Sequence, residues 1–321
     1  MGGFAFHIVH SRATEVAVAE ALKAEATDAA AFTWVHLASH DEEAQAYLRD
    51  VAGLEAYVVD ALTATETRPR CEAVGGGAFL NLRGRSKVEM ESSDLLASVR
   101  IWAQKGRVFS VNRKPMFAVA AVRDAVERGA VRDPGDLITA FATAITEDLD
   151  PEVADLGDRL DDCEEGLDPE RVFELRRQVT KVRVAAIGYR RFINPQRQAL
   201  EKLAALPGDW LQADDRLHLS GAADRAARMA EELEAIRERS TLMHEALTDL
   251  RAEQIDSRTL VISIVAMVFL PLTFLTGLYG MNVDGLPYAH TPWAFDAIAG
   301  VCVVIAVGVV GYFVRQHWFR G

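Results

Sequence analysis

The fold is decided by an apolar run near the end of the chain, LVISIVAMVFLPLTFLTGLY, which covers residues 260–279 and contains no charged residue. Its length matches the roughly 20 residues that a helix needs to cross about 30 Å of hydrocarbon. A second apolar run, AFDAIAGVCVVIAVGVVGYFV, covers residues 294–314 and carries one charge, Asp296, near its N-terminal end. The sequence therefore predicts two membrane-spanning helices, joined by a short polar outer loop at residues 280–293.

The positive charges predict how these two spans are oriented. Arg251 and Arg258 precede the first span, and the link between the spans contains neither lysine nor arginine. Arg315 and Arg320 lie in the short tail after the second span, residues 315–321. Because lysine and arginine are enriched on the cytoplasmic side of membrane proteins, we expect both ends of the chain in the cytoplasm.

Residues 1–136 show the alternation of an α/β domain. Their short apolar runs are rich in aromatic and β-branched residues and are bounded by turn residues, as strands are. Two stretches between them, EVAVAEALKAEA at residues 15–26 and DEEAQAYLRDVAG at residues 41–53, have the periodicity of amphipathic helices. We therefore expect an α/β cytoplasmic domain. The expected strands are FAFHIVH (4–10), FTWVHLA (32–38), AFLNLRGR (78–85), SVRIWAQ (98–104) and RVFSVN (107–112).

Residues 137–259 are predicted to be helical, and their charge is sharply divided. Twelve carboxylates and one base lie in residues 147–170, whereas nine bases and two acids lie in residues 171–202. Between them, EGLDPER at residues 165–171 contains the glycine and the Asp-Pro step that end one helix and begin another. We expect an antiparallel hairpin whose acidic and basic helices offset each other's charge. The alternative is an acidic surface that collects cations.

A long stalk helix is predicted to follow this hairpin. No glycine or proline interrupts residues 222–270, so one helix is expected to run from the cytoplasm into the first span. Its apolar positions alternate steps of four and three, as in a coiled coil, although Ser240 and Gln254 among them are polar. The seam consists of Met229, Leu233, Ile236, Ser240, Met243, Leu247, Leu250 and Gln254.

Composition and motifs argue against several classes of function. The formal net charge of −12 disfavours nucleic acid as a partner and is compatible with attracting cations. The three cysteines form no C-x-x-C pair, so neither a disulfide framework nor a structural zinc site is indicated.

The histidines form no H-E-x-x-H motif, and His7 and His36 fall in predicted strands, where we expect structural roles. Without a phosphate loop or a nucleophile elbow, the sequence predicts neither an enzyme nor a bound cofactor. The start of the chain lacks the basic flank and cleavage site of a signal peptide, so the N-terminus is expected to stay in the cytoplasm.

One face of the first span is smaller and more polar than the rest. Such a face serves either close packing between helices or the wall of a narrow pore. Pro271 leaves the carbonyl of Met267 without its usual donor, which is less costly beside a wet lumen than in lipid. A single two-helix hairpin cannot enclose a polar path, so a pore requires several copies around an axis. The face consists of Thr259, Ile262, Ala266, Leu270, Thr273 and Gly277.

The polar link begins with Gly280, Met281 and Asn282 at the outer membrane surface. If several copies bring Asn282 to a common axis, its amide oxygens form a neutral ring. Such a ring accepts hydrogen bonds from the water shell of a cation without dehydrating it, so Asn282 would meet the metal through that shell. Asp284 would add negative potential at the outer entrance. Taken alone, Asn282 is better explained as a simple turn residue.

In its setting, Gly280-Met281-Asn282 resembles the motif of the CorA superfamily of divalent metal-ion transporters, which follows the first of two C-terminal membrane helices. The preceding PLTFLTGLYGMN, residues 271–282, is similar to that family's pore helix. ETRPRCE at residues 66–72 and NVDGLPY at residues 282–288 resemble the zinc-transport branch called ZntB rather than the magnesium branch. The resemblance covers nearly the whole chain. Asp284 departs from the branch, which often has a small residue there.

This resemblance implies a homopentameric funnel with an inner ring of first-span helices. It makes Gly280, Met281 and Asn282 the outer selectivity loop, and it makes the polar face of the first span the pore lining. It also implies zinc movement across the bacterial inner membrane, with proton coupling more typical of this branch than of the magnesium branch. The carboxylates by which magnesium-branch members sense cytosolic metal have no clear counterpart in this sequence.

We therefore expect a transporter whose partners are the lipid bilayer, other copies of the chain and a divalent cation, Zn²⁺ first. A magnesium, cobalt or nickel channel of the same architecture is the alternative within the family. The alternative from another class is a membrane-anchored signalling or scaffolding protein, in which the hairpin only holds the cytoplasmic domain near the bilayer. The expected parts of the chain are residues 1–136, 137–259, 260–314 and 315–321.

Overall fold

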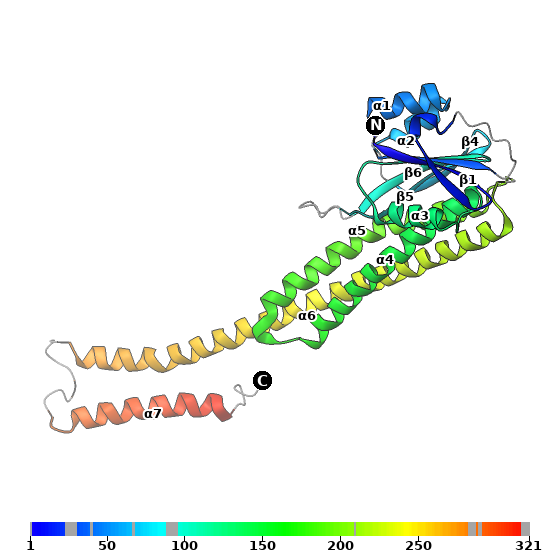
Figure 1. Ribbon diagram of the computed structural model, residues 1–321. Coiled ribbons are helices and arrows are strands. Elements are labelled where there is room, and N and C mark those ends of the chain that lie inside the picture. The colour runs from blue at the N-terminus through cyan, green and yellow to red at the C-terminus, as the bar shows by residue number, and fades with distance from the viewer. Residues whose placement is uncertain are drawn as a thin grey trace. The chain divides into compact units, whose positions relative to one another are not determined.

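The structure is a computed structural model that forms two compact units. The first unit consists of Met1–Gly166 and Leu175–His244, and the second consists of Leu167–Glu174 and Glu245–Gly321. The residues that the structure describes are 2–22, 31–38, 41–65, 68–87, 96–208, 210–281, 287 and 291–315 (Figure 1).

A seven-stranded sheet forms the centre of the first unit. The strand order is β2-β1-β3-β7-β6-β5-β4. β3 and β7 pair in parallel, and the other neighbouring strands pair antiparallel. The strands are β1 (Gly3–Val9), β2 (Arg12–Val16), β3 (Phe32–Leu37), β4 (Arg70–Val74), β5 (Gly77–Arg85), β6 (Leu96–Gln104) and β7 (Arg107–Asn112).

The five expected strands are confirmed as β1, β3, β5, β6 and β7, but the helix expected at residues 15–26 is wrong. Its first residues belong to β2, which pairs antiparallel with β1 so that Val16 lies opposite Ala5. A single 3₁₀ turn, η1 (Val18–Glu20), follows, and residues 23–26 lie outside the described part of the chain. The alanine-rich stretch has local helix propensity, but hydrogen bonds to the exposed edge of β1 override it.

The helix expected at residues 41–53 is confirmed, although it changes its pitch. Asp41 caps α1 (Glu42–Ala46) by accepting a hydrogen bond from the backbone nitrogen of Ala44 at 2.9 Å. The helix then continues as a π-helical turn, η2 (Tyr47–Val51). The turn is held in part by the hydroxyl of Tyr47, which donates to the carbonyl of Val18 at 2.8 Å.

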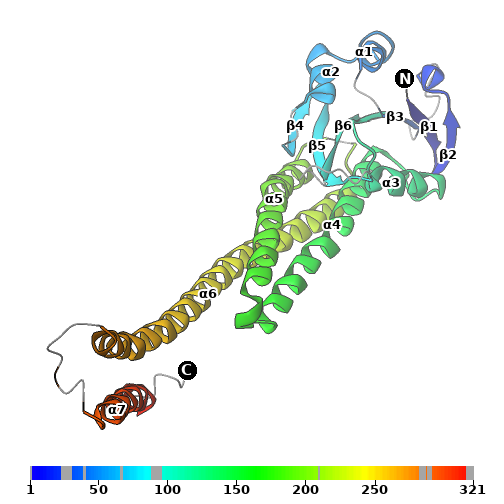
Figure 2. The ribbon, with the colours of Figure 1, turned by 90° about the vertical axis from the view of Figure 1, so that its left-hand side faces the viewer.

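The two faces of the sheet are covered by different helices, as Figure 2 shows. α1, η2 and α2 (Ala56–Thr63) cover one face, whose core includes Val35, Phe79 and Phe109 from the strands. α3 (Phe117–Glu127) and α4 (Pro134–Glu165) cover the other face. There the ring of Trp34 meets that of Phe141 edge-on, with 5.8 Å between the ring centroids. Burying an aromatic side chain of this size contributes about 2–3 kcal/mol, so this contact fixes α4 on the sheet.

The charge-divided region forms α4, a 3₁₀ turn η3 (Pro169–Arg171) and α5 (Val172–Ala204), followed by α6 (Ala213–Tyr279). Arg239 of α6 pairs with Asp161 and Glu164 of the acidic α4, the latter at 2.7 Å. Arg190 of the basic α5 pairs with Glu234 of α6 at 3.0 Å. The expected charge compensation therefore works through a third helix, α6, which contacts both.

The coiled-coil seam of α6 is buried. Its members from Met229 to Leu247 are at most 6% exposed, and Leu250 and Gln254 are half-buried. Ile236 packs closely on α4, where a Cβ added to Gly157 would lie 3.9 Å from its Cδ1 atom. The seam therefore belongs to the core of its own chain, and the buried hydroxyl of Ser240 is accommodated there without a hydrogen-bond partner within the described residues.

Three carboxylates meet where α4 and α6 begin. Asp133 caps α4, Asp136 lies in its first turn and Asp215 lies in the first turn of α6, with carboxylate oxygens within 4.8 Å of one another. Asp215 is 2% exposed. Its pKa is raised to about 6, chiefly by burial, and repulsion from the other two carboxylates adds to the shift.

We predict that Asp215→Asn stabilises the protein at about pH 7.5 and has little effect near pH 4.5. The folded-state pKa of Asp215 is about 6, whereas an unfolded aspartate has a pKa of about 3.9. Stability therefore falls as the pH rises through this interval, and above it the charged group costs on the order of 3 kcal/mol. Scanning fluorimetry of the detergent-solubilised chain should show the variant's melting temperature rising relative to the native one as the pH increases.

Asp224→Asn is the matched control, because Asp224 is exposed on the same helix. This control should leave the melting temperature close to that of the native chain across the same pH range. An effect of Asp215→Asn that does not change with pH would contradict the assignment.

The second unit contains the end of α6, the turn η3 and α7 (Ala294–Arg315). α6 and α7 each contain a stretch long and apolar enough to cross a membrane. Many of their large apolar side chains are exposed in the single chain, among them Phe274 at 69% and Val304 at 71%. Surfaces of this kind require lipid or other protein around them.

Candidate functional site

α7 covers one side of the membrane-spanning part of α6. Ile264 is only 7% exposed. Leu275 and Tyr279 line a pocket of about 220 Å³, whose other wall includes Trp293 and Ala297. This side of α6 is therefore occupied by the second helix of the hairpin.

The residues predicted to line a pore lie on the opposite side of α6. With about 100° per residue, Ala266 is about 200° from Ile264 and about 180° from Leu275 around the helix axis. Ile262 and Leu270 are 68% and 69% exposed. α7 therefore leaves this face uncovered. Its six residues are Thr259, Ile262, Ala266, Leu270, Thr273 and Gly277.

Hydroxyl groups distinguish the uncovered face from its flanks. Ser263 and Thr276 donate to backbone carbonyls of their own helix, Thr259 and Leu272, at 2.8 and 3.0 Å. Their donors are satisfied without water, as a lipid-facing position requires. For the hydroxyls of Thr259 and Thr273, no such bond occurs within the described part of the chain. These two groups can hydrogen-bond to water or to a hydrated ion.

The helix reaches the loop between the two spans without a sharp break. α6 continues through Pro271 and ends at Tyr279, and the backbone nitrogen of Gly280 still donates to the carbonyl of Thr276 at 2.9 Å. Met281 is 48% exposed. The predicted selectivity residue and the predicted entrance residue, Asn282 and Asp284, lie outside the described residues, so their roles stay predictions.

The acidic cluster in the first unit is a second place where a cation could bind. Its carboxylates are already engaged, since Arg132 Nε donates to Asp136 at 2.7 Å and the backbone nitrogen of Gln212 donates to Asp215 at 2.7 Å. Asp133 accepts from the backbone of Asp136 at 2.9 Å. This cluster was not predicted from the sequence because Asp215 is far from the other two in the chain, and the spacing of Asp133 and Asp136 indicates simply a helix cap.

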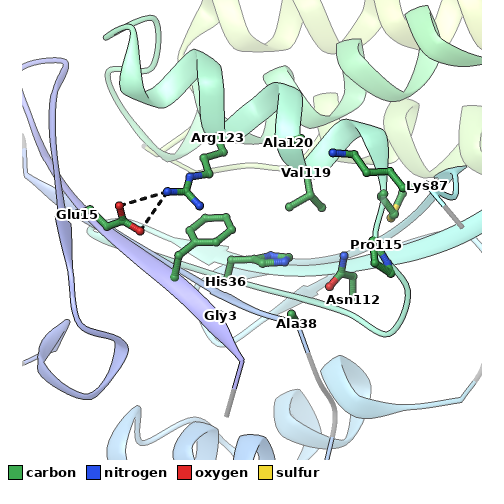
Figure 3. A pocket seen from close by; sticks show the side chains of 12 residues that line it. Gly3, Glu15, His36, Ala38, Lys87, Asn112, Pro115, Val119, Ala120 and Arg123 are labelled. Carbon is green, nitrogen blue, oxygen red and sulfur yellow. Dashed lines mark hydrogen bonds and ion pairs between the residues drawn. The ribbon is translucent and has the colours of Figure 1, made fainter.

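A pocket of about 390 Å³ lies between the sheet and α3 (Figure 3). Arg123 lines it, but its guanidinium already binds Glu15 at 3.2 Å and packs 5.0 Å from the centre of the Phe4 ring. His36 is buried at its floor, where Nδ1 lies 2.8 Å from the hydroxyl of Ser110. Burial lowers the pKa of His36 to about 4, so its ring is neutral at physiological pH. The prediction of a structural role for His36 agrees with this hydrogen-bonded core position.

Comparison with known proteins identifies the family. The family described as "CorA-like Mg2+ transporter protein" matches residues 29–315. The chain belongs to the CorA family.

Relatives within the CorA family extend over most of the chain. The zinc transport protein ZntB of Pectobacterium atrosepticum is 30% identical over 286 residues, which make up 89% of this chain and 87% of the relative. The divalent cation transporter CmaX of Pseudomonas aeruginosa is 33% identical over 265 residues, which make up 82% of this chain and 80% of the relative. The resemblance to the CorA superfamily and its ZntB-like branch is thereby confirmed.

Solved structures support the fold of this CorA-family chain. Full-length CmaX matches with a TM-score of 0.81 and 28% identity, covering 98% of each chain. The CorA magnesium transporter from Methanocaldococcus jannaschii matches with a TM-score of 0.80 and 17% identity, covering 99% of each chain, and shows the fold alone. The expected class, an α/β domain followed by a long helix and a C-terminal apolar helix pair, is confirmed.

We predict that a cysteine at position 273 reacts with a charged, membrane-impermeant thiosulfonate, whereas a cysteine at position 265 does not. Thr273 lies on the uncovered polar face, and Val265, 49% exposed, lies about 100° away from that face, toward lipid. Thiosulfonates react with thiolates, which form in water and not in hydrocarbon. Mass spectrometry of the intact labelled chain in vesicles measures the extent of reaction.

The labelling experiment requires replacing Cys302, the half-buried cysteine of α7, with alanine; Cys71 and Cys163 are buried. Equal reaction of Thr273→Cys and Val265→Cys would show that the uncovered face is no wetter than its flank.

Proposed function

We propose that this CorA-family chain transports divalent cations, Zn²⁺ foremost, across the bacterial inner membrane through a pore made by five copies. The observation that carries the proposal is the uncovered face of α6, which lies opposite α7 and bears hydroxyls without an intrahelical partner among the described residues. The names of the relatives support the substrate class, because ZntB is a zinc transport protein and CmaX a divalent cation transporter.

The proposed pore is formed when five copies turn their uncovered faces toward a common axis. Thr259 and Thr273 then offer hydroxyls to a water-filled path, and Leu270 between them forms a narrow apolar ring. Apolar constrictions of this kind can gate ion passage by excluding water. α7 lies on the outside of the ring, because it covers the opposite side of α6.

The proposed selectivity ring is formed by Asn282, with Gly280 and Met281 completing the loop. Support comes from the sequence and from the end of α6, since Gly280 carries the last helical hydrogen bond seen in the described chain before the outer loop. A ring of amide oxygens placed there would bind the hydration shell of the cation. Asp284 would raise the local concentration of cations at the outer mouth.

The proposed orientation has both termini in the cytoplasm. Arg251 and Arg258 precede the first span, and Arg315 follows the second, whereas the outer loop lacks basic residues. The positive-inside rule then places the α/β domain, the stalk and the tail on the same side of the membrane.

We predict that Asn282→Ala lowers Zn²⁺ entry into reconstituted vesicles by about tenfold. Losing hydrogen bonds worth about 1.4 kcal/mol to the hydrated ion changes a rate by this factor. A zinc-sensitive dye inside the vesicles measures the flux. Thr276→Val is the matched control, because the hydroxyl of Thr276 is bonded to its own helix, and this variant should conduct like the native chain.

The proposal would be contradicted if reconstituted vesicles that contain the native chain pass no Zn²⁺. It would also be contradicted if Asn282→Ala leaves the Zn²⁺ flux unchanged. The description of the matching family favours Mg²⁺ as the second candidate, so Mg²⁺, Co²⁺ and Ni²⁺ should be tested as competitors of Zn²⁺ in the same vesicles. The absence of flux for every metal would favour a membrane-anchored scaffold instead.

Proton coupling is the finer part of this proposal and rests on the ZntB-like resemblance. It requires the Zn²⁺ flux in these vesicles to depend on an imposed pH gradient. A Zn²⁺ flux that is the same with and without the pH gradient would contradict proton coupling. It would not contradict the proposed pore.

A further inference from the structure

A short segment of the cytoplasmic hairpin belongs to the same unit as the membrane-spanning helices. Leu167–Glu174, which we call the hairpin tip, is grouped with residues 245–321. Gln254 of α6 donates through Nε2 to the carbonyl of Pro169 in this tip. The guanidinium of Arg251 lies 5.2 Å from the centre of the Phe173 ring. Two contacts thus fix the tip on α6 just before its first span.

These contacts place the tip close to the membrane surface. Gln254 precedes Leu260, the first residue of the predicted span, by six residues, or about 9 Å along a helix. Subtracting the hydrocarbon core of about 30 Å from a full bilayer of about 40–45 Å leaves about 5–8 Å of headgroups on each side. The part of the tip that contacts Gln254 is therefore within one side chain's length of the headgroup layer.

Phe173 lies beside Arg251, which precedes Leu260 by nine residues, or about 14 Å along the helix. It lies in the first turn of α5, and the contacts of α5 with α6 run in opposite directions along the two helices, with Phe173 beside Arg251 and Arg176 beside His244. The first turn of α5 is therefore its end nearest the predicted span. Side chains on a helix lean toward its N-terminus, which directs the ring of Phe173 toward the bilayer. Phe173 is 71% exposed. An aromatic ring left open to water in this place is better accommodated among lipid headgroups.

Basic groups accompany the ring on α6. Arg251 and Arg258 are both exposed and, being seven residues apart, lie within about 20° of each other around the helix. Arg258 precedes the predicted span by two residues, at the depth where guanidinium groups bind lipid phosphates. The tip also carries carboxylates that would face the same layer, and these disfavour a purely electrostatic attraction to anionic lipid. They are Asp168, Glu170 and Glu174, of which Glu174 pairs with Arg171 at 3.4 Å.

We propose that the hairpin tip docks on the cytoplasmic headgroup layer, with the Phe173 ring inserted among the lipids and Arg251 and Arg258 binding their phosphates. The occupant of this surface is lipid rather than a second protein, because the tip adjoins the span itself and combines an exposed ring with flanking arginines. The contact would anchor the cytoplasmic hairpin to the membrane independently of ion passage. The proposal rests on the proposed function only in requiring that α6 and α7 cross the bilayer.

The test is the collision of spin labels with oxygen, which concentrates in lipid, and with a nickel chelate, which stays in water. Labels are attached to Phe173→Cys, Val265→Cys and Val184→Cys in the full chain with Cys302 replaced by alanine, in vesicles of phosphatidylethanolamine and phosphatidylglycerol. Val184 is the matched control, because it is 63% exposed on the same α5 helix, eleven residues from Phe173. Val265 is the lipid standard.

We expect an oxygen-to-nickel collision ratio at position 173 that is several-fold higher than at position 184 and approaches the ratio at position 265. If the collision ratio at position 173 equals that at position 184 while the ratio at position 265 is high, the spans are inserted in the membrane and the docking proposal is overturned. Low collision rates with both reagents at position 173 would also overturn the docking proposal. They would indicate that this position is buried against another copy of the chain. A low ratio at 265 would instead contradict membrane insertion itself.

Discussion

A helix that crosses hydrocarbon must provide a hydrogen-bond partner for every polar group that it carries. Within the described chain, α6 does so for the hydroxyls of Ser263 and Thr276 on its flanks, but not for those on the face that α7 leaves uncovered. α7 packs over the side that contains Ile264 and Leu275, while the hydroxyls of Thr259 and Thr273 remain on the side that it leaves uncovered. One hairpin cannot enclose water around them. The requirement to shelter this face leads to the proposed assembly, to the position of α7 outside it, and to the placement of a selectivity ring where α6 ends.

Outside the two spans, the helix that continues into the first span is held by a packed core. The seam of α6 from Met229 to Leu247 is buried, and ion pairs such as Arg239 with Glu164 and Arg190 with Glu234 tie it to both helices of the hairpin. The buried residues of the seam are consequently not available for contacts between copies of the chain. Contacts between copies in the proposed pore must therefore come from other surfaces, foremost the uncovered face of the span.

Much of this architecture could be predicted from the sequence because its strongest patterns are local. Each of these patterns lies within one segment of the chain. A charge-free run of about 20 residues indicates a membrane span, a short run rich in β-branched residues indicates a strand, and apolar residues at steps of three and four indicate a helix. β2 was missed because hydrogen bonds to the distant β1 outweigh the helix propensity of its alanines. The acidic cluster was missed because Asp215 joins Asp133 and Asp136 only through folding. For the proposed pore, periodicity predicted which face of the first span would line it. The structure was needed to show that α7 covers the opposite side.

The central claim is that copies of the chain close their uncovered faces on one another, and inter-chain cross-linking of a cysteine at position 270 tests it most directly. Leu270 is 69% exposed at the middle of that face, and Leu275, on the side that α7 covers, is the reference position. In native membranes, a short bifunctional thiol reagent should join chains carrying Leu270→Cys and leave chains carrying Leu275→Cys single. Chains that remain single with the cysteine at 270, or that are joined equally at both positions, would contradict this claim.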